Sequence, residues 1–338
     1  MRSREAASPR TPETPEIATV GSMTTTVSGT PAVSVAGLTK TYGHGSAART
    51  VVDALSFEIP RGVVAGFVGP NGAGKTTTMA MLLGLVRPSA GTGTVLGAPL
   101  ADPSAYLGRV GALIDGPALW PGLTGEQNLR ALAALGGHDA AAVPGLLELV
   151  GLGDRGRDRF RSYSLGMKQR LAIAATLLGD PRLLILDEPS NGLDPVGMRD
   201  MRELVARVAD GGRTVFVSSH LLGDLEQICD WLLVLDRGVL LYQGPTAGFL
   251  AQAVPQVFAT PEDVTDLARL VELAKRSGED VTATTDGVLI PVPRGDARAV
   301  AVAVNRAAIG EGIVLAELAV RRPDLEAHYL AQVEGISR

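Results

Sequence analysis

Short runs of apolar residues recur along the middle of the chain and differ in spacing from the segments between them. The runs are rich in Val, Ile and Leu, a composition typical of buried strands. They comprise Val33 to Val35, Leu55 to Ile59, Val63 to Val68, Leu183 to Leu186, Thr214 to Val217 and Trp231 to Leu235. Strands that alternate with helical stretches predict an α/β core, with its binding site at the carboxyl end of a strand.

A helical pattern fills the region between these strands from Leu123 to Leu178. Leu129 to Leu135 and Val143 to Val150 have apolar residues at helical spacing, and Gly136-Gly137 separates them. A further helix is expected from Met167 to Leu178, with Ser164 as its N-cap. We therefore expect a domain of residues 32–245 that carries a helical subdomain at about residues 117–178.

The pattern changes after Gly244-Pro245 and predicts a separate accessory domain of residues 246–338. The expected elements follow the order β-α-β-β-α-β, which is the ferredoxin-like arrangement. They are a strand Pro255 to Ala259, a helix Glu262 to Arg276, strands Val281 to Thr285 and Val288 to Val292, a helix Ala297 to Ala308 and a strand Ile313 to Val320. Asp286-Gly287 predicts a hairpin turn between the middle strands. A final helix is expected at about Asp324 to Val333, and the role of the domain is regulatory, dimer-supporting, partner-docking or purely stabilising.

The ends and the overall composition exclude several classes of protein. Residues 1–31 are rich in Ser, Thr and Pro and contain no apolar block, which predicts a disordered tail rather than a signal peptide. No run of about 18 apolar residues is present, so no membrane span is expected. The net charge of −5 argues against a basic surface for nucleic acid, and one cysteine excludes an intramolecular disulfide.

The first chemical motif is the stretch Gly69-Pro-Asn-Gly-Ala-Gly-Lys-Thr76, which follows the strand Val63 to Val68. It fits the phosphate-loop pattern G-x-x-x-x-G-K-[ST]. Backbone N–H groups of the loop and the positive end of the following helix, Thr77 to Leu85, would point at phosphate oxygens. Lys75 supplies a positive charge for the phosphates, and the Thr76 hydroxyl is a ligand for Mg²⁺. The motif predicts a nucleotide site.

A second motif follows the strand Leu183 to Leu186, where Asp187 and Glu188 stand in succession. A carboxylate at a strand end beside a phosphate loop suits Mg²⁺, held directly or through water. The next carboxylate, Glu188, is placed to polarise an attacking water. The sequence therefore predicts nucleotide hydrolysis at this site.

Three further motifs lie around the second one. Tyr163-Ser-Leu-Gly-Met-Lys-Gln-Arg170 precedes it, and Pro189-Ser-Asn-Gly-Leu-Asp-Pro195 and Val217-Ser-Ser-His220 follow it. In this order the chain resembles the nucleotide-binding subunit of an ATP-binding-cassette (ABC) transporter over about residues 33–245. The resemblance implies a P-loop NTPase core of ABC type that needs ATP and Mg²⁺.

The resemblance also implies roles for individual residues. The catalytic residues are Lys75, Glu188 as the base and His220 as the switch histidine. The residues that bind ATP are Tyr42, which stacks on the adenine, and Gly69, Pro70, Asn71, Gly72, Ala73, Gly74, Lys75, Thr76 and Thr77. The signature residues, which contact ATP on the opposite subunit, are Ser164, Leu165, Gly166 and Met167. The interface loop is Asn191, Gly192, Leu193 and Asp194, and the Mg²⁺ ligands are Thr76, Asp187 and, as a third candidate, Asp115.

Two positions depart from the usual family pattern. Asp115 stands where the family has Gln, and Leu165 stands where the signature has its first Gly. A carboxylate at position 115 is still a ligand that Mg²⁺ accepts. Both departures resemble the branch that exports bacitracin, lantibiotics and related peptide antibiotics. The alternative is neutral drift within any drug-export branch.

The function implied by the resemblance is an ATPase that powers a separate membrane permease for export of an antibiotic, peptide or drug. The partners would be that permease, near Asp115 to Leu119, and a second identical or related nucleotide-binding subunit. The location would be cytoplasmic, on the inner face of a bacterial membrane.

The alternatives are a soluble ABC ATPase of the ribosome or the chromosome, and a binding module that has lost its ATPase activity. Two features argue against the first alternative. Ribosomal members carry two cassettes in one chain, whereas this chain has one phosphate loop. Chromosomal members insert a long coiled coil between the phosphate loop and the signature, and here only about ninety residues separate the two. Lys75, Glu188 and His220 argue against the second.

Overall fold

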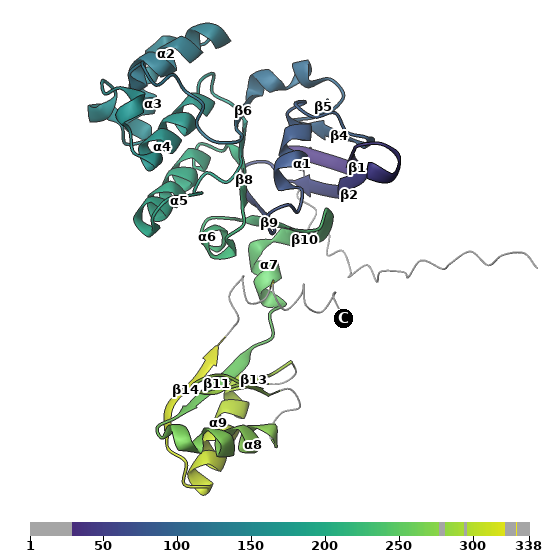
Figure 1. Cartoon of the computed structure of the whole chain (residues 1–338), viewed down its shortest axis with the longest axis vertical. Coiled ribbons are helices and arrows are strands. Elements are labelled where there is room, and N and C mark those ends of the chain that lie inside the picture. Colours follow the sequence, from purple (N-terminus) through teal and green to yellow (C-terminus); the bar gives the residue numbers. More distant parts are fainter. Residues whose placement is uncertain (1–28, 277–280, 294–295, 322–328, 330–338) are drawn as a thin grey trace, which may run out of the picture.

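The computed structural model describes residues 29–276, 281–293, 296–321 and 329. Figure 1 shows two parts, a larger one with two lobes and a smaller one that an extended segment after α7 joins to it. Within the described residues the strands form three sheets, one of six strands and two of four. The predicted disordered tail lies outside the described residues, as does the final helix except for Tyr329.

The six-stranded sheet is the centre of the larger part. Its strand order is β10-β9-β3-β8-β7-β6, and all neighbours are parallel except β10 and β9. The strands are β3 (Val64–Val68), β6 (Val110–Leu113), β7 (Leu183–Leu186), β8 (Thr214–Ser219), β9 (Trp231–Asp236) and β10 (Val239–Pro245). Both β3 and β7 are buried along their whole length, which explains why they have apolar runs rather than alternation. The prediction of these two strands is confirmed.

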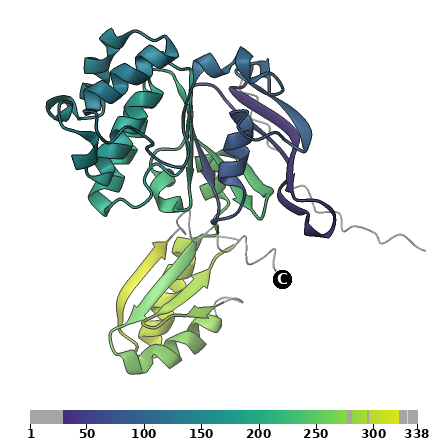
Figure 2. The same ribbon diagram turned by 45° about the horizontal axis from the view of Figure 1, so that its top comes forward.

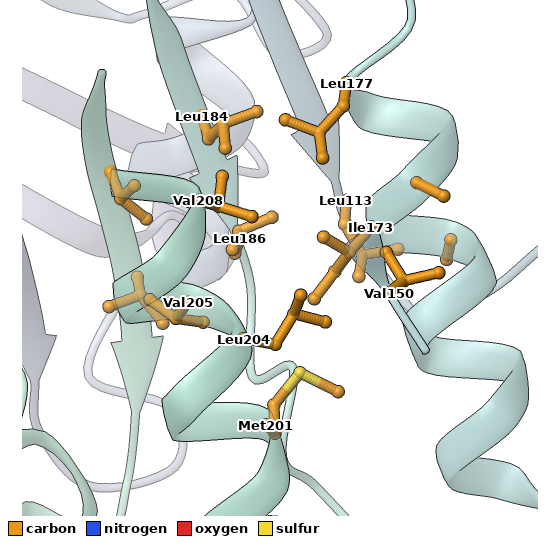
Figure 3. Packing of buried hydrophobic residues seen from close by; sticks show 14 of the residues in the cluster. Leu113, Val150, Ile173, Leu177, Leu184, Leu186, Met201, Leu204, Val205 and Val208 are labelled. Atoms are coloured by element: carbon orange, nitrogen blue, oxygen red, sulfur yellow. The ribbon is translucent and has the colours of Figure 1, made fainter. Parts of the chain in front are cut away.

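Successive residues of the sheet belong to two separate hydrophobic clusters, one on each face. Leu184 and Leu186 belong to the cluster on the side of the helical lobe, whereas Leu183 and Ile185 belong to the cluster on the opposite side. Figure 3 shows Leu184 and Leu186 facing the side chains of two helices, α4 (Leu165–Thr176) and α5 (Pro195–Ala209). The sheet is therefore covered on both faces, and only its strand ends are open for chemistry.

A second, antiparallel sheet covers the face opposite to the helical lobe. Its order is β2-β1-β4-β5, formed by β1 (Val33–Tyr42), β2 (Arg49–Ile59), β4 (Ala90–Val95) and β5 (Ala98–Pro99). The helix α1 (Lys75–Leu82) buries Met79 and Met81 in the same cluster. Sequence patterns located only the ends of β1 and β2 and missed β4, β5 and β10. β4 is largely exposed and rich in Gly and Thr, and β5 has only two residues, so neither has an apolar run. β10 does contain the apolar run Val239 to Tyr242, which was not recognised as a strand.

The helical lobe agrees closely with the prediction. It contains α2 (Gly125–Gly136), α3 (Val143–Leu149) and α4. The side chain of Thr124 accepts a hydrogen bond from the N–H of Gln127 and Gln127 returns one, which forms a capping box, and Gly137 ends α2 with a φ of 68°. Ser164 is the N-cap of α4, as predicted, although α4 begins two residues earlier and ends at Thr176.

The C-terminal sheet has the order β12-β13-β11-β14, which is the ferredoxin-like order predicted from the sequence. Its strands are β11 (Gln256–Pro261), β12 (Thr282–Ala283), β13 (Val288–Pro291) and β14 (Leu315–Arg321). The helices α8 (Leu267–Lys275) and α9 (Ala297–Gly310) pack on one face of it and enclose a separate core. Both views show this part set apart from the larger one (Figures 1 and 2).

Two details of this part differ from the prediction. Ala283 pairs with Val288, so a four-residue loop rather than the two residues Asp286-Gly287 joins the middle strands. Thr284 closes that loop, because its N–H donates to the carbonyl of Gly287 and its hydroxyl accepts from the N–H of Gly287. The first helix begins at Leu267 rather than Glu262, after a short 3-10 turn at Val264–Asp266.

Residue 245 remains the expected boundary between the two domains. Just beyond it lies α7 (Thr246–Ala251), whose Phe249 is buried in the core of the larger part. The ring of Phe249 lies 4.8 Å from that of Tyr242, measured between centroids. The larger core thus continues to Leu250, five residues past the expected boundary. None of the helices in the described part of the chain has the length and apolarity that a bilayer span requires.

Substitution of Gly111 in β6 by Ala should destabilise the larger part. A Cβ at this position would overlap the carbonyl oxygen of Thr176 at the end of α4 and lie 2.7 Å from Leu184 Cδ2. We expect the free energy of unfolding to fall by about 1–3 kcal/mol, measured by urea denaturation. Gly108→Ala is the matched control, since no heavy atom lies within 4 Å of a Cβ there. Equal stability of the two variants would contradict this close approach.

Candidate functional site

The predicted phosphate loop joins the end of β3 to the start of α1. Gly74 is the N-cap residue of α1 and has a φ of 102°, and Gly72 has a φ of 82°, both in the left-handed region that favours glycine. A Cβ on Gly69 would overlap the carbonyl oxygen of Leu235, and one on Gly74 would lie 2.8 Å from that of Val51. These three glycines are therefore required by backbone conformation or by close approach. Their conformation lets the loop turn tightly from the end of β3 into the start of α1.

Lys75, the first residue of α1, is only 5% exposed. Its Nζ donates to the carbonyl of Gly69 at 2.7 Å and of Pro70 at 3.3 Å, and it forms an ion pair with Glu188 Oε1 at 3.2 Å. A buried ammonium is stable only when it has such partners. The side chain is thus held at the centre of the loop, beside the predicted catalytic carboxylate.

The predicted metal ligands Thr76 and Asp187 are in direct contact. The Thr76 hydroxyl donates to Asp187 Oδ2 at 2.6 Å, and the Ser218 hydroxyl donates to Asp187 Oδ1 at 2.5 Å. A hydroxyl and a carboxylate are hard oxygen donors of the kind that Mg²⁺ prefers. These side chains therefore suit a magnesium ion that also contacts phosphate. The third candidate, Asp115, is exposed in the turn after β6 and has a φ of 58°.

Glu188 follows at the end of β7 and has a φ of 47°, an uncommon conformation for a residue with a side chain. Its N–H donates to the Ser218 hydroxyl at 2.9 Å, and its Oε2 lies 2.5 Å from Nδ1 of His220. The conformation turns the carboxylate towards Lys75 and His220. Lys75 of the loop and the predicted catalytic carboxylate thus face each other.

A pocket of about 300 Å³ lies between the phosphate loop and this carboxylate. Its walls are Val51, Asn71, Gly72, Gly74, Lys75, Thr76, Thr77, Glu188, Asn191 and His220. The structure therefore brings together most of the predicted loop residues with the predicted base and the predicted histidine. Tyr42 does not line the pocket, and it is 43% exposed near the end of β1 with Lys40 Nζ 4.9 Å from its ring centroid.

The signature residues are also absent from the pocket walls. Ser164 caps α4 by accepting a hydrogen bond from the N–H of Met167 at 3.3 Å, and Leu165 is 44% exposed. The interface loop is ordered by Asp194, which caps α5 by accepting from the N–H of Gly197 at 2.9 Å. The start of α4 is therefore available to a ligand that lies outside this chain's own pocket.

Ser218 has a role in the site that sequence patterns did not assign. It is fully buried, and its hydroxyl connects Asp187 to the backbone of Glu188. The signal lies in the strand order, since β7 and β8 are parallel neighbours and Leu186 pairs with Val217. The residues after these two partners, Asp187 and Ser218, must therefore lie together. That order is not visible before the fold is known.

Comparison with known proteins agrees with the geometry. Residues 52–191 match the family described as ABC transporter. The chain is 44% identical over 196 residues to the uncharacterized ABC transporter ATP-binding protein YhcH of Bacillus subtilis. The aligned region covers 57% of this chain and 64% of YhcH. It is 44% identical over 207 residues to the bacitracin transport ATP-binding protein BcrA of Enterococcus faecalis, covering 60% and 66%. The matched region thus spans slightly less than two thirds of these two relatives.

A third relative is covered more completely. The lantibiotic transport ATP-binding protein SrtF of Streptococcus pyogenes is 36% identical over 206 residues, covering 61% of this chain and 87% of SrtF. Among solved structures, an ATP-binding subunit of an ABC transporter aligns with a TM-score of 0.57 and 31% identity, over 65% of this chain and 92% of the other. The cbiO1 protein of Clostridium perfringens shares the fold, with a TM-score of 0.59 and 24% identity over 66% and 91% of the two chains.

Ser218→Ala should destabilise the protein although it removes a single oxygen atom. The change leaves a buried oxygen of Asp187 without its donor and the N–H of Glu188 without its acceptor. Since unsatisfied buried polar groups cost about 1–3 kcal/mol, we expect a loss of that size in urea denaturation. Ser162→Ala is the matched control, because that hydroxyl is exposed and bonded only to a local carbonyl. A loss no larger than in the control would show that Ser218 does not organise the two carboxylates.

Proposed function

Because this chain belongs to the ABC transporter family as an ATP-binding protein, we propose that it hydrolyses ATP to power the exporter of which it is a subunit. The observation that carries the proposal is the pocket between the phosphate loop and Glu188. A positively charged helix start, a buried lysine and two carboxylates with separate partners meet there. This combination suits a nucleotide phosphate together with the water that attacks it.

The phosphates of ATP are bound mainly by the loop and by Lys75. Backbone N–H groups at the start of α1 and the helix dipole favour negative charge at this point. Lys75 now shares its ammonium among Gly69, Pro70 and Glu188. A phosphate is a stronger partner than a carbonyl, so the lysine turns its charge to the phosphates when ATP is present. Tyr42 stacks on the adenine from the end of β1.

Thr76 and Asp187 would hold a magnesium ion, and Asp115 is the third candidate ligand. When bound, the ion neutralises part of the charge on the phosphates. The Thr76 hydroxyl donates to Asp187 Oδ2, so the two side chains that would hold the ion lie side by side. Ser218 keeps its bond to the other oxygen of Asp187 and so fixes the direction of the carboxylate.

Glu188 acts on the attacking water. Its carboxylate faces the pocket and accepts a proton from a water held there, while His220 keeps the carboxylate in one orientation through Nδ1. The displacement of Lys75 towards the phosphates releases one oxygen of Glu188, since Lys75 Nζ is now 3.2 Å from Oε1. Positioning and charge are then sufficient for phosphoryl transfer to water.

Two copies, or this chain and a related subunit, work together. Ser164, Leu165, Gly166 and Met167 stand at the start of α4 outside this chain's own pocket, where they contact ATP held by the second copy. The interface loop Asn191 to Asp194 lies between the two sites. Closure of the pair on two ATP molecules, followed by reopening after hydrolysis, drives the permease.

The exporter assignment rests on the named relatives. BcrA and SrtF are named as bacitracin and lantibiotic transport proteins, and a further relative from Ralstonia nicotianae as a Nod factor export protein. We extend this to export of an antibiotic, peptide or drug through a separate permease that contacts the loop Asp115 to Leu119. The chain then resides at the inner face of the membrane. No observation favours a ribosomal or chromosomal role.

Glu188→Gln should bind ATP and form the closed pair, yet hydrolyse ATP about 10²–10⁴-fold more slowly. The amide keeps the shape of the side chain but does not accept the proton. Steady-state phosphate release and gel filtration with ATP measure the two effects. Glu203→Gln on the exposed side of α5 is the matched control and should retain full turnover. Near-normal turnover of Glu188→Gln would remove Glu188 from the role of base.

Affinity capture of the chain from its own membranes with Mg·ATP should recover a polytopic membrane protein. The physical reason is that the chain's described part has no helix that spans a bilayer, whereas transport needs one. Identification of the captured proteins by mass spectrometry, with Lys75→Ala as a control that binds ATP poorly, measures this. Recovery of ribosomal or chromosomal proteins without a permease would contradict the transporter assignment.

A further inference from the structure

The start of α4 and the interface loop interlock within the same chain. A Cβ placed on Gly192 would lie 3.1 Å from Leu165 Cδ2, and one placed on Gly166 would lie 3.5 Å from Leu193 Cδ2. Each leucine therefore lies against the glycine of the other segment. Gly192 has a φ of 76°, so the loop presents its bare backbone to Leu165.

A hydrogen bond fixes the same two segments further along α4. The buried side chain of Gln169 donates from Nε2 to the carbonyl of Asn191 at 3.0 Å. Gln169 and Leu165 are four residues apart, so they lie on one face of the helix. Two contacts, one apolar and one polar, thus hold the loop to this face.

The loop continues directly to the catalytic carboxylate. The N–H of Asn191 donates to the carbonyl of Glu188 at 3.0 Å, and Asn191 lines the pocket together with Glu188 and His220. A displacement of Gly192 therefore moves a wall of the pocket and the turn that orients Glu188. Leu165 is connected to the reacting groups although it does not line the pocket.

We propose that Leu165 is a positioning residue that, through Gly192 and Asn191, holds the interface loop so that Glu188 faces the pocket. The inference rests on the proposed function, because it concerns the same ATPase site. Glycine at position 165 would have no side chain to lie against Gly192. In this chain the leucine supplies that contact, so the departure from the usual signature strengthens the connection between the two segments.

The connection has a consequence for the pair of subunits. Ser164, next to Leu165, is the residue expected to meet ATP on the second copy. The segment that meets the partner's nucleotide is thus the segment that holds this copy's own Glu188. Occupancy of one site then alters the readiness of the other.

A measurement on the nucleotide-free protein tests the contact without any contribution from the second copy's ATP. Amide hydrogen exchange of a peptide that covers Glu188 to Asp194 reports the bond from the N–H of Asn191 to Glu188. We expect Leu165→Ala to exchange about tenfold faster there, whereas Leu165→Met, which keeps a long apolar side chain, should resemble the original protein. Leu135→Ala is the control, since Leu135 is an exposed leucine of the same lobe.

Kinetics of ATP hydrolysis complete the test. We expect Leu165→Ala to lower kcat about tenfold and to change KM less than about twofold, with an unchanged melting temperature. Absence of turnover in the unsubstituted protein would contradict the proposed function itself. If the unsubstituted protein hydrolyses ATP but Leu165→Ala leaves kcat or the hydrogen exchange unchanged, only the role of Leu165 is overturned. A fall in melting temperature, an equal effect in Leu135→Ala, or equally fast exchange in nucleotide-free Leu165→Met would likewise overturn it.

Discussion

The parallel register of β3, β7 and β8 is the constraint on which the site depends. Val68 pairs with Ser219, and Leu186 pairs with Val217, so these strands end at one edge of the sheet. The phosphate loop follows β3, Asp187 and Glu188 follow β7, and β8 ends with Ser218 and Ser219 just before His220. Because the carboxyl ends of neighbouring parallel strands lie at the same edge of a sheet, segments that are distant in the sequence meet there. The rest of the larger part covers this sheet and keeps the edge open.

Hydrogen bonds and an ion pair stabilise the buried charge of Lys75 at this edge of the sheet. Lys75 has two carbonyl partners and Glu188, and Glu188 in turn has His220. Asp187 takes its hydrogen bonds from two hydroxyls instead of from the lysine. The two adjacent carboxylates therefore have separate partners, which suits separate tasks.

The two outward-facing segments give the molecule its second level of organisation. The signature at the start of α4 and the interface loop lie in contact with each other, while the signature stays out of the pocket of its own chain. A site completed by a second copy needs such an arrangement. The C-terminal part has a core of its own and is joined through α7, whose Phe249 is buried in the larger core. It is thus attached to the ATPase core without contributing to the pocket walls.

The sequence by itself determined the elements whose apolar pattern is strong and the residues whose chemistry is local. The buried strands β3 and β7, the cap of α4 by Ser164, the glycine loop and the pair Asp187 and Glu188 were all predicted, because each depends on neighbours within a few residues. The C-terminal β-α-β-β-α-β order was predicted for the same reason. Only the tertiary structure decided the strand order, and with it the role of Ser218, the bond of Gln169 to Asn191 and the contact of Leu165 with Gly192. The strand β4 also escaped prediction, since it has no apolar run and becomes a strand by pairing with β1, far along the chain. The strands β5 and β10 pair locally with β4 and β9, and these two short hairpins were missed.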